Sequence, residues 1–337
     1  MDFPIDHYED TVVEVSALKE GIEQMPLLKA HMKIGLEFWD WAGYHSELWM
    51  GQEVRIVPKQ PPKDQYVEVG NIRTRYWVLG DGKSSVILLH GLGGFIENRE
   101  DNVAALAQGR RVYALDLAGF GRSDRPQVKY SIPYLTEFVR EFMIVHDVDK
   151  AALIGESMGG AIALRFALQY PHQVEKIVLV ASAGLGKEVS IYLRMMSLPI
   201  IGELSSRPSR KRTVQTLKLL LHNQDLIADR WIEGGYEMSS LPGAKRCLLS
   251  ALRSMCNIRG FRSKVYSPIL ERLEEIEVPT LVIWGAQDRI LPSSHAHQAA
   301  KRLPNVRVDI FDPCGHLPNI ERAEQFNALV TDFLFNE

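Results

Sequence analysis

The chain has 337 residues, of which 46% are hydrophobic and 24% are charged, the proportions of an ordinary globular protein. Its net charge is −3, so no overall basic field is present to hold nucleic acid, and we expect no nucleic-acid partner. The three cysteines, Cys247, Cys256 and Cys314, form neither a Cys-x-x-Cys pair nor a zinc-spaced set. This spacing argues against a disulfide scaffold and a thiolate metal site.

The N-terminus does not read as an export signal. Its first fifteen residues carry five acidic side chains, where a secretory signal has positive charge and an apolar run. The longest apolar stretches, such as residues 85–89 and 177–181, are far shorter than the roughly 20 residues that cross a bilayer. The sequence therefore predicts a cytoplasmic protein without a transmembrane segment.

Residues 1–64 are predicted to form a helical N-terminal extension. From residue 16 to about 50 the apolar residues recur at spacings of three and four, as one face of a helix requires, although Pro26 and Gly35 interrupt the pattern. A polar, proline-rich break at 59–63 closes the segment. Packing of this face on the main domain is the simplest interpretation, and a homodimer contact or a peripheral membrane contact stays open.

The next segment changes to short strands. Residues 66–69 and 72–79 predict an antiparallel hairpin that turns at Gly70-Asn71. Compact runs rich in Val, Ile and Leu follow, most of them separated by helix-length segments, and this alternation predicts an α/β protein with a parallel sheet and helices on both faces. The runs are residues 86–89, 112–115, 151–154, 177–180, 281–284 and 306–311.

One connection is too long for a simple crossover. About ninety residues separate the run at 177–180 from the one at 281–284, and a connection of that length carries structure of its own. It contains helical patterns at 189–198, 211–221 and 244–256, broken by Pro208, Gly234-Gly235 and Pro242-Gly243. The sequence therefore predicts a helical cap at 184–274, between core segments 65–183 and 275–337.

A candidate nucleophile follows the strand predicted at 151–154. The run Gly155-Glu156-Ser157-Met158-Gly159 is a G-x-S-x-G motif between a strand and a helix-favouring segment, 161–169. In that context the turn is tight, so small residues are needed at Gly155 and Gly159, and the Ser157 hydroxyl is exposed at the carboxyl edge of the sheet. The following helix also favours negative charge there. We interpret Ser157 as a nucleophile.

A serine needs a base, and the base needs a carboxylate to hold it. Asp288 lies just beyond the strand predicted at 281–284, and His316 lies in the loop after the last predicted strand. All three side chains are thus expected at one edge of the sheet, in the order Ser, Asp, His, which is not the order of either common serine-protease arrangement. We assign His316 as the base and Asp288 as its orienting acid, and Asp312 stays an alternative acid.

Backbone N–H groups are expected to bind the developing oxyanion. His90-Gly91-Leu92-Gly93-Gly94 follows the strand at 86–89 and offers a glycine-rich turn at the same edge. We assign the N–H groups of Leu92 and Met158 to the oxyanion hole, with His90, Gly91 and Gly93 as supports of the loop. The chain lacks a Gly-Lys-Ser/Thr ending or a G-x-G-x-x-G that opens a helix, so a nucleotide site is not indicated and no cofactor is predicted.

The region from about residue 66 to 335 resembles the α/β-hydrolase superfamily. The resemblance rests on the motifs at 90–94 and 155–160, on Trp284-Gly285-Ala286-Gln287-Asp288, on Gly315-His316, and on Asp116-Leu117-Ala118-Gly119-Phe120-Gly121-Arg122-Ser123. It implies eight mostly parallel strands, a helical cap over a triad, no cofactor, and an acyl-enzyme or closely related mechanism. Capped esterases and hydrolases of meta-cleavage products are the most similar branches.

Departures within the motifs narrow the expected activity. Epoxide hydrolases and haloalkane dehalogenases have an aspartate where this chain has Ser157. Meta-cleavage hydrolases usually have a Gly-Gly-Gly-Pro-Gly type oxyanion loop and an aromatic residue after the histidine, whereas this chain has Gly91-Leu92-Gly93-Gly94 and Leu317. We therefore expect a serine hydrolase of carboxylic esters, with a small-molecule ester as its substrate.

Other functions remain open at this stage. A carbon–carbon bond hydrolase of vinylogous diketones would use the same triad, as would a thioesterase, an acyltransferase or a perhydrolase. A lyase or a non-catalytic small-molecule receptor is also compatible with the fold. A receptor would bind its ligand with negligible multiple turnover.

Overall fold

The computed structural model describes residues 61–336, so the N-terminal extension predicted at 1–64 lies almost wholly outside the described residues. Residues 61–64 form neither helix nor strand. No helix within 61–336 is both long enough and apolar enough to cross a membrane.

Eight strands form one sheet in the order β1-β2-β4-β3-β5-β6-β9-β10. β2 pairs antiparallel with β1 and with β4, and the other neighbouring pairs are parallel. The mostly parallel sheet and its opening hairpin are confirmed. The strands are β1 (Gln65–Val69), β2 (Ile72–Leu79), β3 (Ser85–Leu89), β4 (Arg111–Leu115), β5 (Ala151–Glu156), β6 (Val174–Val180), β9 (Thr280–Gly285) and β10 (Val306–Phe311).

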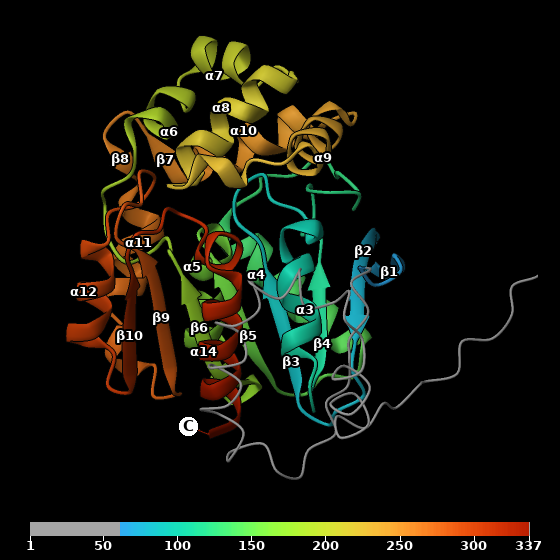
Figure 1. Cartoon of the computed structure of the whole chain (residues 1–337), viewed down its shortest axis with the longest axis vertical. Helices are drawn as coiled ribbons and strands as arrows, with labels where there is room; N and C mark the ends of the chain where they lie inside the picture. Colours follow the sequence, from blue (N-terminus) through green and yellow to red (C-terminus); the bar gives the residue numbers. More distant parts are fainter. Residues whose placement is uncertain (1–60, 337) are drawn as a thin grey trace, which may run out of the picture. The chain divides into compact units, whose positions relative to one another are not determined.

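Helices cover both faces of this sheet (Figure 1). Alternate residues of each strand enter different cores, so that Ile87 and Leu89 of β3 pack in one cluster and Val86 and Leu88 in the other. The first cluster includes side chains of α4, α5 and α12, and the second those of α3 and α14. The helices around the sheet are α3 (Glu100–Leu106), α4 (Ile132–Val145), α5 (Met158–Gln169), α12 (Ser294–Arg302), α13 (Pro318–Glu321) and α14 (Ala323–Asn336).

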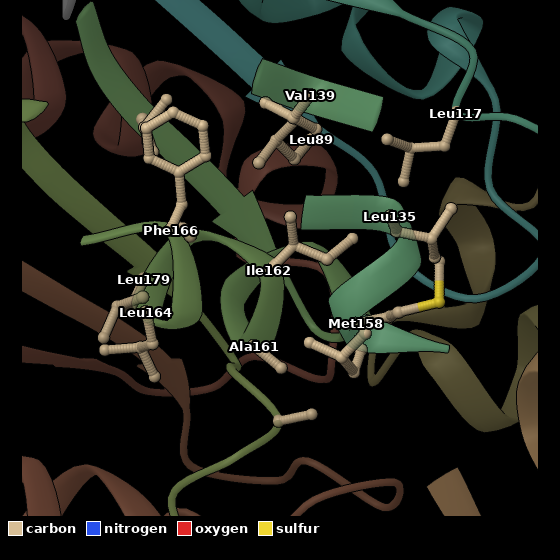
Figure 2. Close-up of a cluster of buried hydrophobic side chains, with 14 of the residues drawn as sticks. Leu89, Leu117, Leu135, Val139, Met158, Ala161, Ile162, Leu164, Phe166 and Leu179 are labelled. Atoms are coloured by element: carbon tan, nitrogen blue, oxygen red, sulfur yellow. The ribbon is translucent and has the colours of Figure 1, made fainter. Parts of the chain in front are cut away.

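The helix α5 is the best-buried helix at the centre of the fold. Figure 2 shows Ile162 and Phe166 of α5 in the buried cluster with Leu89 of β3 and Val139 of α4. Nine of the twelve residues of α5 are buried, as expected of a helix whose residues are almost all apolar. Burying each large aliphatic or aromatic side chain stabilises the fold by about 1.5–3 kcal/mol. This packing holds α5 in place, and with it the position of its first residue.

A mainly helical insertion connects β6 to β9, and Figure 1 shows most of it beyond the ends of the strands. The three helices expected from the sequence are present as α6, α8 and α10. The insertion contains α6 (Ile191–Met196), α7 (Pro199–Ser205), α8 (Arg210–Leu220), α9 (Asp229–Ser240), α10 (Ala244–Met255), the short hairpin β7 (Cys256–Asn257) and β8 (Gly260–Phe261), and α11 (Ser263–Leu270).

The break predicted at Gly234-Gly235 is wrong, because both glycines lie inside α9. A Cβ atom at Gly235 would lie 2.7 Å from Cγ2 of Thr213 on α8. The glycine therefore lets α8 and α9 approach closely, and this packing outweighs the cost of about 1 kcal/mol that glycine carries in a helix.

This close approach predicts a coupled pair of substitutions. We expect Gly235→Ala to lower the free energy of unfolding by about 1–3 kcal/mol through overpacking against Thr213. In a Thr213→Ser background, which removes Cγ2 and keeps the hydroxyl, the same change should raise it by about 0.5–1 kcal/mol, the usual gain of alanine over glycine in a helix. Urea unfolding of the four proteins measures both effects, and equal effects in the two backgrounds would contradict the packing explanation.

Candidate active site

Ser157 stands at the turn between β5 and α5. Its backbone has φ 50° and ψ −112°, in a region that costs a residue with a side chain about 1–3 kcal/mol. The turn is held in place because the Ser157 N–H donates to the Val180 oxygen at 2.9 Å and the Ala183 N–H donates to the Ser157 oxygen at 2.9 Å. The structure thus has the strained strand–turn–helix geometry that the motif predicts for a nucleophile.

The two glycines of the motif are required by close backbone contacts. A Cβ atom at Gly159 would lie 2.3 Å from the carbonyl oxygen of Leu89, at the end of β3, and one at Gly155 would lie 2.3 Å from the carbonyl oxygen of Gly159. No side chain fits at either distance. The first turn of α5 therefore lies directly against the end of β3, which brings the loop that follows β3 next to the Ser157 turn.

Asp288 and His316 form a buried pair. Asp288 Oδ2 lies 2.7 Å from His316 Nδ1, while Asp288 Oδ1 accepts the N–H groups of Ile290 and Leu291 at 2.7 and 3.0 Å. The side chains of Asp288 and His316 are 0% and 3% exposed, so this pair lies in a low dielectric. Because the carboxylate occupies Nδ1, Nε2 is the ring nitrogen left to accept a proton.

Electrostatics around His316 favour its protonated form. Burial alone lowers the pKa of the ring, but the negative charge of Asp288, its hydrogen bond and the charge of Glu156 together raise it above its usual value. His316 is thereby a stronger base than a free histidine, and it acts as a base only at a pH above its raised pKa.

The structure does not bring every predicted pair together. Within residues 61–336 the Ser157 hydroxyl is not hydrogen-bonded to His316. Such contacts are often long without substrate and tighten only in the complex, so this geometry leaves the assignment of Ser157 as it was predicted. The ends of β5, β9 and β10, which carry the three residues, lie at one edge of the sheet.

The glycine-rich loop after β3 is braced by His90. His90 Nε2 accepts the Leu117 N–H at 3.0 Å, so the ring proton is on Nδ1, which lies 2.7 Å from the carbonyl oxygen of Gly91. Burial, with a smaller contribution from Arg99, lowers the pKa of His90 to about 4. A neutral ring with both nitrogens engaged is suited to holding a loop rather than to moving protons.

Two backbone N–H groups are available beside this loop. Met158 is the first residue of α5, so its N–H has no partner within the helix, and no other group in residues 61–336 accepts it. Within residues 61–336 no group accepts the N–H of Leu92 either. Leu92 lies in the turn that is closed by the hydrogen bond from the Gly94 N–H to the Gly91 oxygen at 3.1 Å. Gly93 adopts φ 76°, which favours glycine. An oxyanion hole from Leu92 and Met158 remains a prediction.

A buried ion pair that the sequence analysis missed lies beside the nucleophile. Arg99 Nη2 is 2.9 Å from Glu156 Oε2, and both side chains are almost fully buried. Arg99 also donates to the Leu89 oxygen at 3.2 Å, and Glu156 Oε1 would lie 2.8 Å from a Cβ atom at Gly91. Gly91 thus leaves room for a carboxylate against the oxyanion loop. The sequence could have indicated Glu156, which lies inside the G-x-S-x-G motif. Its partner Arg99 is far away in sequence, so the ion pair could not be predicted.

Glu321 is a second residue that the sequence analysis missed. Its Oε1 accepts the Gly315 N–H at 2.6 Å, and its Oε2 accepts the N–H groups of His222 and Asn223 in the insertion, the latter at 3.1 Å. The N–H of His316 also donates to the oxygen of Leu220 at 2.7 Å. One carboxylate therefore fastens the insertion to the loop that carries His316. We name this set of hydrogen bonds the Glu321 clamp.

Fold and site together define a hydrolase whose candidate nucleophile lies on a strained turn at the carboxyl edge of a mostly parallel sheet. The chain belongs to the α/β-hydrolase fold family, whose model matches residues 84–323. The family match and similarities to known proteins confirm the resemblance to this superfamily and to its meta-cleavage branch that the sequence motifs indicate.

Three comparisons describe what the chain is similar to. It is 33% identical over 278 residues to a 2-hydroxy-6-oxononadienedioate/2-hydroxy-6-oxononatrienedioate hydrolase of Comamonas testosteroni, covering 80% of this chain and 93% of the relative. A meta-cleavage product hydrolase from Pseudomonas fluorescens IP01 has a TM-score of 0.69 at 27% identity, with 80% and 97% covered. A membrane phospholipase A has a TM-score of 0.71 at 25% identity, with 92% and 98% covered.

The buried pair beside Ser157 predicts an effect on the pH profile. Glu156→Gln removes a negative charge that raises the pKa of His316, so the acidic limb of kcat/KM should move to lower pH. It also leaves Arg99 buried without a counter-charge, at a cost of about 3 kcal/mol in the free energy of unfolding.

A double variant separates these two effects. Arg99→Met with Glu156→Gln should recover most of the stability, since no uncompensated charge stays buried, and should keep the shifted limb. Thermal unfolding and a pH series measure them independently. An unchanged acidic limb in both variants would show that Glu156 does not act on His316.

The Glu321 clamp predicts a loss of turnover without unfolding. Glu321→Ala should lower kcat roughly 100-fold, the effect of a misplaced catalytic group, with a smaller change in KM. Asn223 and Glu321 line a cleft of about 490 Å³, so water can replace the lost carboxylate oxygens and the fold should survive. Glu324→Ala, an exposed carboxylate in the first turn of α14, is the matched control. Equal kcat values for the two variants would refute a positioning role.

Proposed function

We propose that this chain is a serine hydrolase of the meta-cleavage type, which breaks the carbon–carbon bond next to the ketone of a vinylogous diketone. The observation that carries the proposal is the 33% identity to a hydrolase of that class, over 80% of this chain and 93% of the relative. The buried Asp288–His316 pair supports it, since it supplies the base that such a reaction needs. We therefore favour hydrolysis of a carbon–carbon bond, which the sequence left as an alternative, over the ester hydrolysis expected from the sequence.

The proposed reaction uses His316 first as a base and then as an acid, while Asp288 holds its imidazole at 2.7 Å. His316 Nε2 takes the proton of Ser157 as its oxygen adds to the ketone carbon, and the N–H groups of Leu92 and Met158 bind the resulting oxyanion. In the diketone form, the bond to the neighbouring CH2 carbon then breaks, its electron pair passes into the conjugated enone as a dienolate, and that fragment leaves with the proton from His316. A water molecule activated by His316 finally releases the acid from the Ser157 ester.

Within this proposal the insertion, residues 184–274, acts as a cap. Most of its helices lie beyond the strand ends, and the Glu321 clamp fastens its segment 220–223 to the His316 loop. A cap in contact with that loop excludes water and orients a small substrate. The core segments 65–183 and 275–337 then form one domain interrupted by this cap.

Hydrolysis of carboxylic esters is the second candidate. The departures at Leu92 and Leu317 from the pattern of meta-cleavage hydrolases favour it, and so does the similarity to a solved membrane phospholipase A. Both candidates share the acyl-enzyme, and they differ only in the leaving group that the site accepts. Thioester hydrolysis, acyl transfer to other acceptors and peracid formation follow from the same intermediate.

A direct comparison of substrates tests both candidates. We expect the wild type to bleach 2-hydroxy-6-oxononadienedioate, measured by loss of its absorbance, faster than it hydrolyses p-nitrophenyl esters from acetyl to dodecanoyl. Ser157→Ala should abolish the faster activity, and Asp288→Asn should lower kcat roughly 10⁴-fold because the imidazole tautomer is lost. Asp312→Asn, the alternative acid, is the matched control and should leave kcat nearly unchanged.

The outcomes distinguish the candidates. Turnover of the esters alone would transfer the assignment to an esterase. Binding of either substrate without multiple turnover, in a protein that is folded by circular dichroism, would overturn both and indicate a receptor.

A further inference from the structure

The outer tip of the insertion exposes an unusual number of large aliphatic side chains. Ile200 is 75% exposed and Ile191 is 64% exposed, and three more exposed aliphatic residues accompany them. We call this set the tip patch, and it consists of Ile191 of α6, Ile200, Ile201 and Leu204 of α7, and Ile258 in the turn between β7 and β8. Figure 1 shows α7 at the end of the insertion that is farthest from the sheet.

The helix α7 is amphipathic in the reverse sense of an ordinary surface helix. Its one buried residue is Gly202, whose missing side chain lets α7 pack on the oxygen of Met196 and on Leu249. Ile200 and Leu204 lie on the side of the helix opposite Gly202 and are 75% and 47% exposed. Glu203 is paired with Lys245 and Arg253. A surface helix that buries glycine and exposes isoleucine is built to meet something apolar.

The segments that carry the tip patch are held next to one another. α6 and α7 pack against each other, and α6 packs against β7. Arg194 of α6 donates to the carbonyl oxygen of Ile258 at 2.7 Å, and the backbone oxygen of Lys187 accepts the N–H of Phe261 at 2.9 Å. The turn that carries Ile258 is therefore held beside the first turn of α6.

Unpaired cations surround this apolar surface. Lys187, Arg207 and Arg259 are exposed, and within residues 61–336 none of their side chains forms an ion pair or hydrogen bond. Residues 184–274 carry fifteen Lys and Arg against eight Asp and Glu, in a chain whose net charge is −3. The positive charge is thus concentrated in the segment that carries the exposed aliphatic residues.

We propose that the tip patch is a docking surface for a membrane that contains anionic lipids. Exposed isoleucine and leucine side chains flanked by lysine and arginine match the boundary between acyl chains and acidic headgroups, where apolar burial and charge attraction act together. A second copy of the chain fits less well, because two such surfaces would bring like charges together. Docking in this way places the insertion against the lipid.

Vesicle co-sedimentation of the full chain tests this proposal. The wild type should bind vesicles of phosphatidylcholine with phosphatidylglycerol more tightly than vesicles of phosphatidylcholine alone. Ile200→Gln with Leu204→Gln should weaken binding to the anionic vesicles at least about tenfold. Arg207→Gln with Arg259→Gln should weaken it roughly 25-fold, about fivefold for each cation, and should remove most of its salt dependence.

A matched control and two measurements keep the result clear. Ile144→Gln with Val145→Gln removes two exposed aliphatic residues at the end of α4, away from the tip patch, and should bind as the wild type does. Circular dichroism and turnover of a soluble ester or diketone should be the same in all variants. Undiminished binding in both tip variants, as expected if residues 1–60 held the membrane, would overturn the proposal. So would a wild type that ignores vesicles and sediments as a dimer that Ile200→Gln with Leu204→Gln dissociates.

Discussion

The close contact between the start of α5 and the end of β3 is the constraint on which the site depends. Gly159 has no room for a side chain beside the Leu89 oxygen, and Gly155 has none beside Gly159. Because nine of the twelve residues of α5 are buried in the core, the helix cannot move away to relieve this contact. The chain must therefore turn sharply at Ser157, with φ 50°, and the packing of the core compensates for the strain.

Buried charge around Ser157 is arranged in opposed pairs. The carboxylate of Asp288 favours a protonated His316, and Arg99 balances Glu156 immediately beside the nucleophile. His90 is kept neutral instead, because burial lowers its pKa to about 4 and its two nitrogens are already engaged. Each ionised group in this region therefore has a fixed partner, and protonation of His316 is the charge change that the surroundings favour.

Local patterns in the sequence predicted the sheet well, since each buried strand is a short run of Val, Ile and Leu bounded by turn residues. They also placed Ser157, Asp288 and His316 at strand ends, and the Asp288–His316 contact agrees with that placement. The helices of the insertion were harder to predict from the sequence. Gly235 signals a helix break in isolation, and only the nearness of Thr213 explains why it lies within α9. Arg99 was missed because its partner Glu156 is distant in sequence, and Glu321 because His222 and Asn223 are, and no periodicity reports such contacts.

The Glu321 clamp has a consequence for how this fold can diverge. An insertion between β6 and β9 could be thought of as an exchangeable module. In this chain, however, the backbone N–H groups at 222 and 223 bind Glu321, and the oxygen of Leu220 accepts the N–H of His316, so the insertion helps to hold His316 in place. Recombination that replaced the insertion would have to recreate that backbone path, whatever side chains it introduced. Point substitutions on the insertion's outer helices face no such requirement. Substrate range should therefore drift by surface and lining changes within an inherited insertion more readily than by wholesale exchange.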